Sequence, residues 1–164
     1  MNQAPPERAP GRPSRGLARL HRETLVPRSL DETFAFFSNA ANLERLTPPW
    51  VNFRILTPLP IRMGPGTLID YQIRIRGVRI NWRTEIIVWE PPHRFVDVQL
   101  RGPYRWWHHQ HRFAACGGTG TTRVIDDVEY RAPLWFISHP LLVNRDVARI
   151  FDYRETALVR VLGP

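Results

Sequence analysis

The sequence predicts an α+β fold, a curved antiparallel sheet of about seven strands around one long C-terminal helix, with two short helices between strands 1 and 2. Two observations predict it. From residue 50 to residue 131, runs of alternating β-type residues are separated by proline- and glycine-containing turns, which is typical of an antiparallel meander. From Leu141 the apolar period becomes helical and continues for about 22 residues, enough for a helix of about 33 Å that crosses a small sheet.

Composition restricts the class of protein. The 164 residues are 43% hydrophobic and 23% charged, which indicates one globular domain with a sizeable core. Residues 1–16 combine proline, glycine, arginine and serine without apolar periodicity, so we expect a disordered tail before a single domain at 17–164. The single cysteine, Cys116, excludes an internal disulfide. No apolar run reaches membrane-spanning length and no signal-peptide region is present, so we expect a cytoplasmic protein without integral membrane association.

The charge is strongly basic, with a net charge of +8 from 23 arginines and no lysine. The arginines are scattered along the predicted strands, often at alternating positions, and form no block of five to eight. Scattered charge is typical of a solvated sheet face. We therefore expect no nucleic-acid partner.

The elements before the sheet follow from local signals. Leu17–Leu25 alternates weakly, as a strand near an edge does. The helix Ser29–Phe37 begins with a capping box, in which the first residue and Glu32 satisfy each other's backbone amides. Asn39 can cap a second short helix, Ala40–Leu46, which ends at a run of threonine and prolines.

The remaining strands alternate inward and outward residues. They are expected at Trp50–Thr57, Thr67–Arg76, Val78–Trp89, Arg94–Leu100, Tyr104–Ala115 and Thr121–Arg131. Gly77 marks the turn between the second and third of these.

One predicted sheet face is unusual. Arg105, Trp107, His109, His111 and Phe113 fall on one face of their strand, and the next strand presents Asp126, Val128 and Tyr130 together. Such a face is too apolar for a solvent surface and too polar for an ordinary core. We interpret it as the wall of a ligand cavity.

A set of motifs in this order resembles a known superfamily. The motifs are Phe34-x-Phe36-Phe37, Leu46-Thr47-Pro48-Pro49, Gly66-x-x-x-x-Tyr71, Trp82-Arg83-Thr84-Glu85-Ile86, Gln99-x-x-Gly102-Pro103-Tyr104, Trp107-x-His109-x-His111-x-Phe113 and Asp126-x-Val128-x-Tyr130. Over residues 17–162 the chain resembles the START-like (SRPBCC) superfamily of helix-grip proteins, in particular a bacterial ligand-binding branch described as polyketide cyclase/dehydrase-like. The resemblance implies the helix-grip fold but assigns no catalytic residue, because this fold carries binders, carriers and enzymes alike.

The resemblance and the face pattern together imply a cavity between the sheet and the C-terminal helix. The expected ligand is hydrophobic or amphipathic (lipid, isoprenoid or polyketide-like), with a polar end at Arg105 or His109. The residues expected to contact it are Tyr71, Trp82, Gln99, Arg105, Trp107, His109, His111, Phe113, Asp126 and Phe151.

Alternatives to simple ligand binding stay open. His109, His111 and Asp126 suit a buried polar network or ligand contact, which we favour, but also a divalent metal set or acid–base chemistry in a cyclase or dehydratase. We expect neither a metal nor another cofactor. The apolar segment Leu134–Ile137 between two prolines suits a protein-interaction module, or packing under the long helix. The sequence does not indicate an oligomeric state.

Overall fold

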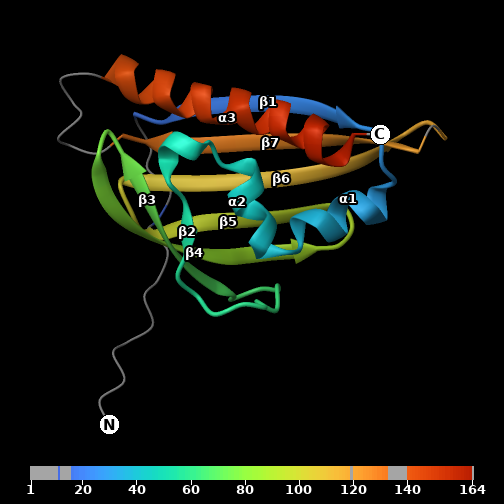
Figure 1. Ribbon diagram of the computed structural model, residues 1–164, viewed down its shortest axis with the longest axis horizontal. Coiled ribbons are helices and arrows are strands. Elements are labelled where there is room, and N and C mark those ends of the chain that lie inside the picture. The colour runs from blue at the N-terminus through green and yellow to red at the C-terminus, as the bar shows by residue number, and fades with distance from the viewer. Residues whose placement is uncertain (1–10, 12–15, 119, 133–139, 164) are drawn as a thin grey trace, which may run out of the picture.

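The structure is a computed structural model that describes residues 11, 16–118, 120–132 and 140–163 (Figure 1). Nearly all of the predicted tail, and the Leu134–Ile137 segment, lie outside the described residues. The described chain forms one seven-stranded sheet in the order β1-β7-β6-β5-β4-β3-β2, and every neighbouring pair is antiparallel.

The predicted meander is confirmed. The strands are β1 Ala18–Val26, β2 Arg54–Ile55, β3 Leu68–Ile75, β4 Val78–Glu90, β5 Arg94–Arg101, β6 Trp106–Cys116 and β7 Thr121–Arg131. β1, the first strand along the chain, pairs with β7, the last, and so lies at an edge of the sheet.

The helices are α1 Leu30–Phe37, the 3₁₀ turn η1 Ala40–Asn42, α2 Leu43–Leu46, the 3₁₀ turn η2 Pro49–Val51, and α3 Pro140–Leu162. Both predicted caps are present. Ser29 and Glu32 form the capping box of α1, and the Asn39 side chain accepts a hydrogen bond from the Ala41 amide. The predicted second helix is therefore a 3₁₀ turn followed by one α-helical turn.

The prediction of a strand over Trp50–Thr57 is wrong for most of its length. The first residues belong to η2 (Pro49–Val51), and the residue that caps its C-terminus, Asn52, has a left-handed φ of 46°. An extended strand cannot pass through that conformation. Only Arg54 and Ile55 pair with β3.

The β3–β4 hairpin forms the curled part of the sheet. It turns at Arg76 and Gly77, whose φ values of 49° and 84° suit a primed turn that matches strand twist. Ile69, Tyr71, Ile73 and Ile75 all face inward, as their alternation predicts. A register irregularity between Ile86 and Val88 then bends β4.

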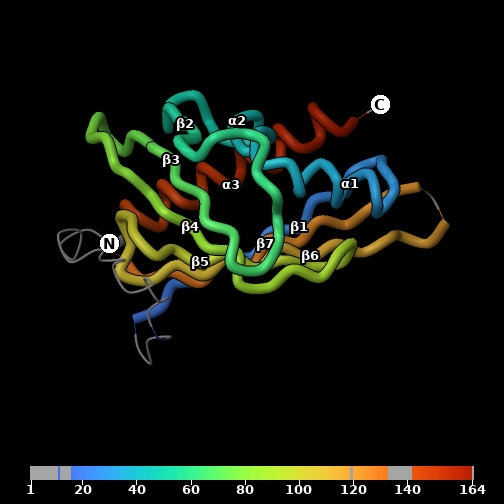
Figure 2. Tube along the Cα trace, turned by 90° about the horizontal axis from the view of Figure 1, so that it is seen from below, coloured from blue at the N-terminus to red at the C-terminus, as the bar shows by residue number. Residues whose placement is uncertain are grey.

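α3 lies across the concave face of the sheet, and α1 and α2 lie on the same side (Figure 2). Val147 and Phe151 of its first half pack with Leu20 and Val128 of β1 and β7. Its second half buries Leu158 completely in a cluster that also holds phenylalanines of α1, β5 and β6. A nearly straight helix cannot contact a curved sheet everywhere, so space remains between α3 and the curled strands.

Candidate functional site

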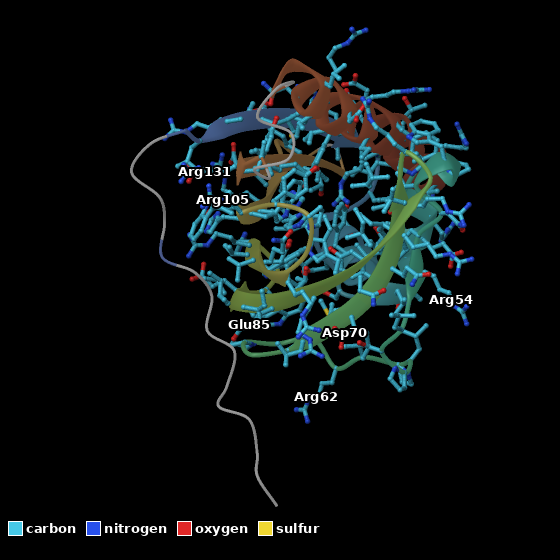
Figure 3. The ribbon with its side chains drawn as sticks, turned by 90° about the vertical axis from the view of Figure 1, so that its left-hand side faces the viewer. Arg54, Arg62, Asp70, Glu85, Arg105 and Arg131 are labelled. Carbon is cyan, nitrogen blue, oxygen red and sulfur yellow. The ribbon has the colours of Figure 1, made fainter. Side chains whose placement is uncertain are left out.

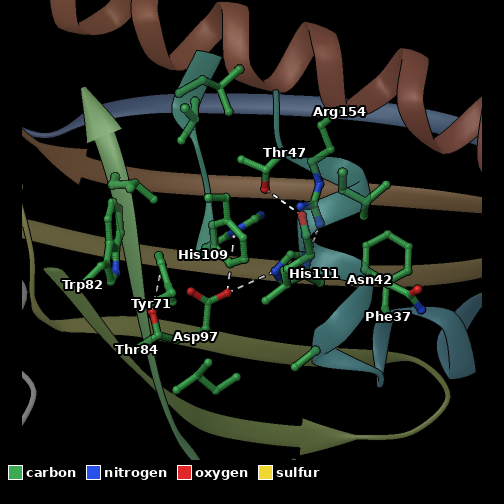
Figure 4. Close-up of a pocket in the computed structure, with 18 of the residues that line it drawn as sticks. Phe37, Asn42, Thr47, Tyr71, Trp82, Thr84, Asp97, His109, His111 and Arg154 are labelled. Carbon is green, nitrogen blue, oxygen red and sulfur yellow. Dashed lines mark hydrogen bonds and ion pairs between the residues drawn. The ribbon is translucent and has the colours of Figure 1, made fainter. Parts of the chain in front are cut away.

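A cavity of about 180 Å³ lies in that space, between α3, the α2 region and strands β3 to β6 (Figure 4). Its lining is mostly aliphatic and aromatic. The aromatic members are Phe36, Phe37, Phe53, Tyr71, Trp82, Phe95, Tyr104, Trp107 and Phe151, and the polar members are Asn39, Asn42, Thr47, Thr84, Asp97, His109, His111 and Arg154. The polar side chains are thus a minority within an apolar enclosure, which is the usual composition of a small-molecule site.

The polar wall of the cavity is built by cross-strand pairing. In the β5–β6 register Asp97 is directly opposite His109, and in the β6–β7 register His111 is directly opposite Asp126. His111 Nε2 lies 3.1 Å from Asp97 Oδ2, and His109 Nδ1 lies 3.6 Å from the same oxygen. The imidazole rings are 3.7 Å apart between centroids. One carboxylate oxygen therefore faces a nitrogen of each histidine.

Asp126 holds the other side of both rings. His109 Nε2 is 2.9 Å and His111 Nδ1 is 2.8 Å from Asp126 Oδ1. Arg154 of α3 donates from Nε to Asp126 Oδ2 at 3.2 Å, and its guanidinium lies over the Phe37 and Phe151 rings. Asp126 and Arg154 are both buried, so the helix is joined to the sheet by an ion pair away from water.

The charges of this cluster follow from burial and proximity. Burial lowers the pKa of His109 to about 4, helped by neighbouring His111 and opposed by both aspartates. Burial alone would raise the pKa of Asp126, but the Arg154 charge and the histidine hydrogen bonds hold it well below its usual range. The pKa of Asp97 is likewise lowered, because its hydrogen bond to His111 and the nearby positive charges outweigh burial. At neutral pH both carboxylates are ionised and His109 is neutral.

The opposite wall is aromatic. Tyr71 and Trp82 stack at 5.6 Å between centroids, and Trp107 meets the Trp82 ring edge to face at 5.3 Å. Tyr71 Oη lies 3.3 Å from Thr84 Oγ1. Trp82 Nε1 is buried and has no hydrogen-bond partner among the described residues. A buried N–H donor without a partner is costly, so this wall has one polar group for which an acceptor is missing.

The structure brings part of the predicted contact set together. Tyr71, Trp82, Trp107, His109, His111 and Phe151 line the cavity, whereas Gln99, Arg105, Phe113 and Asp126 do not. Phe113 packs instead against Phe34 and Phe37 in the core. Asp126 lies one layer behind the histidines.

Gln99 and Arg105, two of the predicted contact residues that do not line the cavity, are associated with the loop between β5 and β6. Gln99 is bound at both ends of its amide to the backbone of Tyr104, donating to its oxygen at 2.6 Å and accepting from its nitrogen at 3.2 Å. Tyr104 is thereby held outside the strand, which starts only at Trp106. Arg105 is exposed and lies near Arg131 at the margin of the molecule (Figure 3). The prediction that Arg105 meets the ligand is corrected on this ground, because strand alternation does not extend into the loop.

The sequence reasoning missed Asp97 and Arg154 as site residues. In each case the sequence contains a feature that could have indicated the residue. Asp97 alternates with Phe95 and Gln99 on the inward face of β5, and Arg154 interrupts the apolar face of α3. A charged residue on a buried face needs a partner of opposite charge, so each was a pointer to a polar cluster whose members the sequence could not identify.

Comparison with solved structures agrees with this architecture. The aromatase/cyclase ZhuI from Streptomyces sp. R1128 superposes with a TM-score of 0.72 at 12% identity, over 89% of this chain and 93% of that one. The chain has the helix-grip fold. Major latex-like protein 151 from Panax ginseng matches with a TM-score of 0.66 at 11% identity, over 91% and 99% of the two chains. Norcoclaurine synthase from Thalictrum flavum, a point mutant in complex with a transition-state analogue, matches with a TM-score of 0.60 at 17% identity, over 88% and 95%.

At these identities the likeness establishes the fold of this helix-grip protein and not its ligand. This fold is the one that the START-like (SRPBCC) resemblance predicts. No family model and no curated protein matches the sequence. Among the described residues, no helix is long and apolar enough to cross a membrane.

Proposed function

We propose that this protein binds a compact amphipathic small molecule in the cavity between α3 and the sheet. The observation that carries the proposal is the cavity itself, an apolar and aromatic enclosure with a single buried His–Asp cluster on one wall. Two solved structures with the same fold are named as an aromatase/cyclase and a synthase, which supports a role with small organic molecules.

The size of the cavity favours a small ligand. Drug-sized ligands occupy sites of about 300–1,000 Å³, whereas an engineered apolar cavity of about 150 Å³ holds benzene. A cavity of about 180 Å³ therefore suits a molecule of one or two rings, or a short isoprenoid. A long acyl chain or a multi-ring polyketide would need the walls to move apart.

The polar groups suggest the orientation of the ligand. His109, Asp97 and His111 lie on one wall and offer both acceptors and donors. A flat ring between Trp82, Trp107 and Phe151 would bury its faces against aromatic side chains. The proposed ligand thus has an aromatic or alicyclic body and an oxygen substituent.

Native mass spectrometry of freshly purified protein, with organic extraction of any adduct, tests the proposal. A stoichiometric small organic molecule is the expected result. Ile73→Trp should abolish its uptake, because Ile73 lines the cavity, whereas Val78→Trp should not, because Val78 is exposed at the hairpin of the same strands. Uptake that Ile73→Trp leaves unchanged would place the ligand elsewhere.

A second candidate is an acid–base enzyme of the cyclase or dehydratase type. The observation that favours it is that both histidines face the cavity and are oriented by carboxylates, an arrangement used for proton transfer. His109→Gln separates the two candidates once a ligand is identified. In a binder the substitution changes affinity alone, whereas in an enzyme it removes conversion of a ligand that still binds.

A further inference from the structure

The tip of the β3–β4 hairpin projects beyond the rest of the sheet as a two-stranded arm. β4 pairs with β5 only from Arg83 onward, and β3 pairs with β2 only at Tyr71 and Gln72. Among the described strands, the arm from Ile73 to Trp82 is therefore held by its own ladder alone. A two-stranded ribbon without further partners is marginally stable, so this part of the sheet can move as a unit.

The base of the arm contains a bend. The register between β4 and β5 shifts between Arg83 and Thr84, and such irregularities bend a strand. At the tip, Arg76 and Gly77 have φ values of 49° and 84°, which give a tight turn that keeps the two strands together. Movement at the base thus carries the whole arm, including the side chain of Ile75, which lines the cavity.

The arm meets the first half of α3 through one ion pair and a small apolar contact (Figure 1). Arg76 Nε and Nη2 lie 3.2 and 3.1 Å from Asp146 Oδ2, and the two side chains are 49% and 42% exposed. Ile150, one turn further along α3, packs against the cluster that holds Ile73 of the arm. Elsewhere α3 packs closely against β1 and α2.

This contact lies at the rim of the cavity. Ile75 and Val147, the chain neighbours of the two charged residues, both line the cavity, as does Ile150. On each side the chain thus passes from an exposed charge to the cavity wall within one residue. We propose that the seam between the hairpin arm and α3 is the entrance of the cavity, and that the Arg76–Asp146 ion pair holds this entrance closed. The inference rests on the proposed function and adds how a ligand enters and leaves.

The strength of the ion pair suits repeated opening. An exposed pair contributes little to stability, because solvent competes for both charges and salt screens them. The buried Arg154–Asp126 pair, farther along the helix, keeps α3 on the sheet while the arm moves. Loss of the Arg76–Asp146 pair should raise the open population roughly two- to five-fold. Because opening precedes both entry and exit, both rates should rise by the same factor, and the dissociation constant should not change.

Exchange of fluorobenzene, measured by ¹⁹F NMR, tests the inference. The probe carries no charge, and an engineered apolar cavity of about 150 Å³ holds a benzene ring. Arg76→Asn and Asp146→Asn each remove the ion pair, and asparagine tolerates the left-handed φ at the first of these positions. Each should raise the association and dissociation rates equally, and Arg76→Asp combined with Asp146→Arg should restore the wild-type rates. The matched control is Arg79→Asn, which removes one positive charge from an exposed position of the same arm and should change neither rate.

A measurement on the wild type covers the case in which a variant does not fold. High salt should raise both wild-type exchange rates, because it screens the exposed pair, and should leave those of Arg76→Asn unchanged. Absence of fluorobenzene binding, or binding that Ile73→Trp leaves unchanged, would contradict the proposed function and the entrance together. Binding in the cavity with rates that neither salt nor the substitutions alter would overturn the entrance alone. A weaker affinity with an unchanged association rate would also overturn it, because Arg76 and Asp146 would then contribute to ligand binding itself.

Discussion

Replacement of Arg154 by methionine tests the energetic role of the ion pair between α3 and the sheet. The substitution keeps most of the apolar stem but leaves Asp126 buried without its cation. Arg154 and Asp126 have exposed side-chain fractions of 11% and 5%, so solvent cannot replace the lost partner. Breaking one partner of a buried pair costs about 3–5 kcal/mol of unfolding free energy, which for a chain of this length is a Tm decrease of roughly 6–20 °C.

The loss of unfolding free energy in Arg154→Met should depend on pH. In the wild type the pKa of Asp126 is depressed, so its stabilisation is present above its unfolded value of about 3.9 and is lost as the pH falls through the folded value. Without Arg154 the burial effect raises that pKa, so the ionised carboxylate destabilises the fold at neutral pH. Protonation relieves this penalty. The difference between variant and wild type should therefore be larger at pH 7 than at pH 5.

Urea unfolding at both pH values measures the effect. Arg22→Met is the matched control, since Arg22 pairs with Asp152 of the same helix at 2.9 Å but in a solvated position, and should cost no more than about 1 kcal/mol. The double variant with Asp126→Asn should recover part of the loss, because it removes the uncompensated charge. A cost for Arg154→Met that equals the control, or that grows toward pH 5, would refute the reasoning.

Three further predictions concern stability. Leu158→Ala should lower the free energy of unfolding in urea by about 2–5 kcal/mol, because Leu158 is fully buried. The control Val159→Ala should lower it by less than about 0.5 kcal/mol, because Val159 is exposed. Equal losses would contradict the packing of α3. Gly102→Ala should lower the Tm and change the near-ultraviolet circular dichroism spectrum, because a Cβ at this position would overlap the Gln99 amide. An unchanged Tm and spectrum would show that the loop between β5 and β6 adapts to the added methyl group. Ser29→Ala should lower the Tm by about 2–4 °C, because α1 loses its N-cap. Thermal unfolding followed by far-ultraviolet circular dichroism measures this shift. An unchanged Tm would mean that the cap does not contribute to stability.

The cavity wall shows where local reasoning succeeds and where it ends. Alternation places His109 and His111 on the inward face of β6 correctly, because side-chain direction in a strand has a period of two. The same rule fails for Arg105, since Gln99 holds the preceding loop and the strand starts only at Trp106. Asp97 was missed for a different reason. Its role depends on the β5–β6 register, which the sequence of either strand alone does not specify.

The sequence by itself determined the element order, the capped first helix, the β3–β4 hairpin and the long final helix, since each depends on contacts within a few residues. Only the tertiary structure decided which polar residues meet. Asp97, His111 and Asp126 come from three neighbouring strands, and Arg154 reaches them from a helix that begins after β7. Register, strand curvature and the position of α3 depend on the packing of distant segments, and these packing energies place the cluster on the cavity wall.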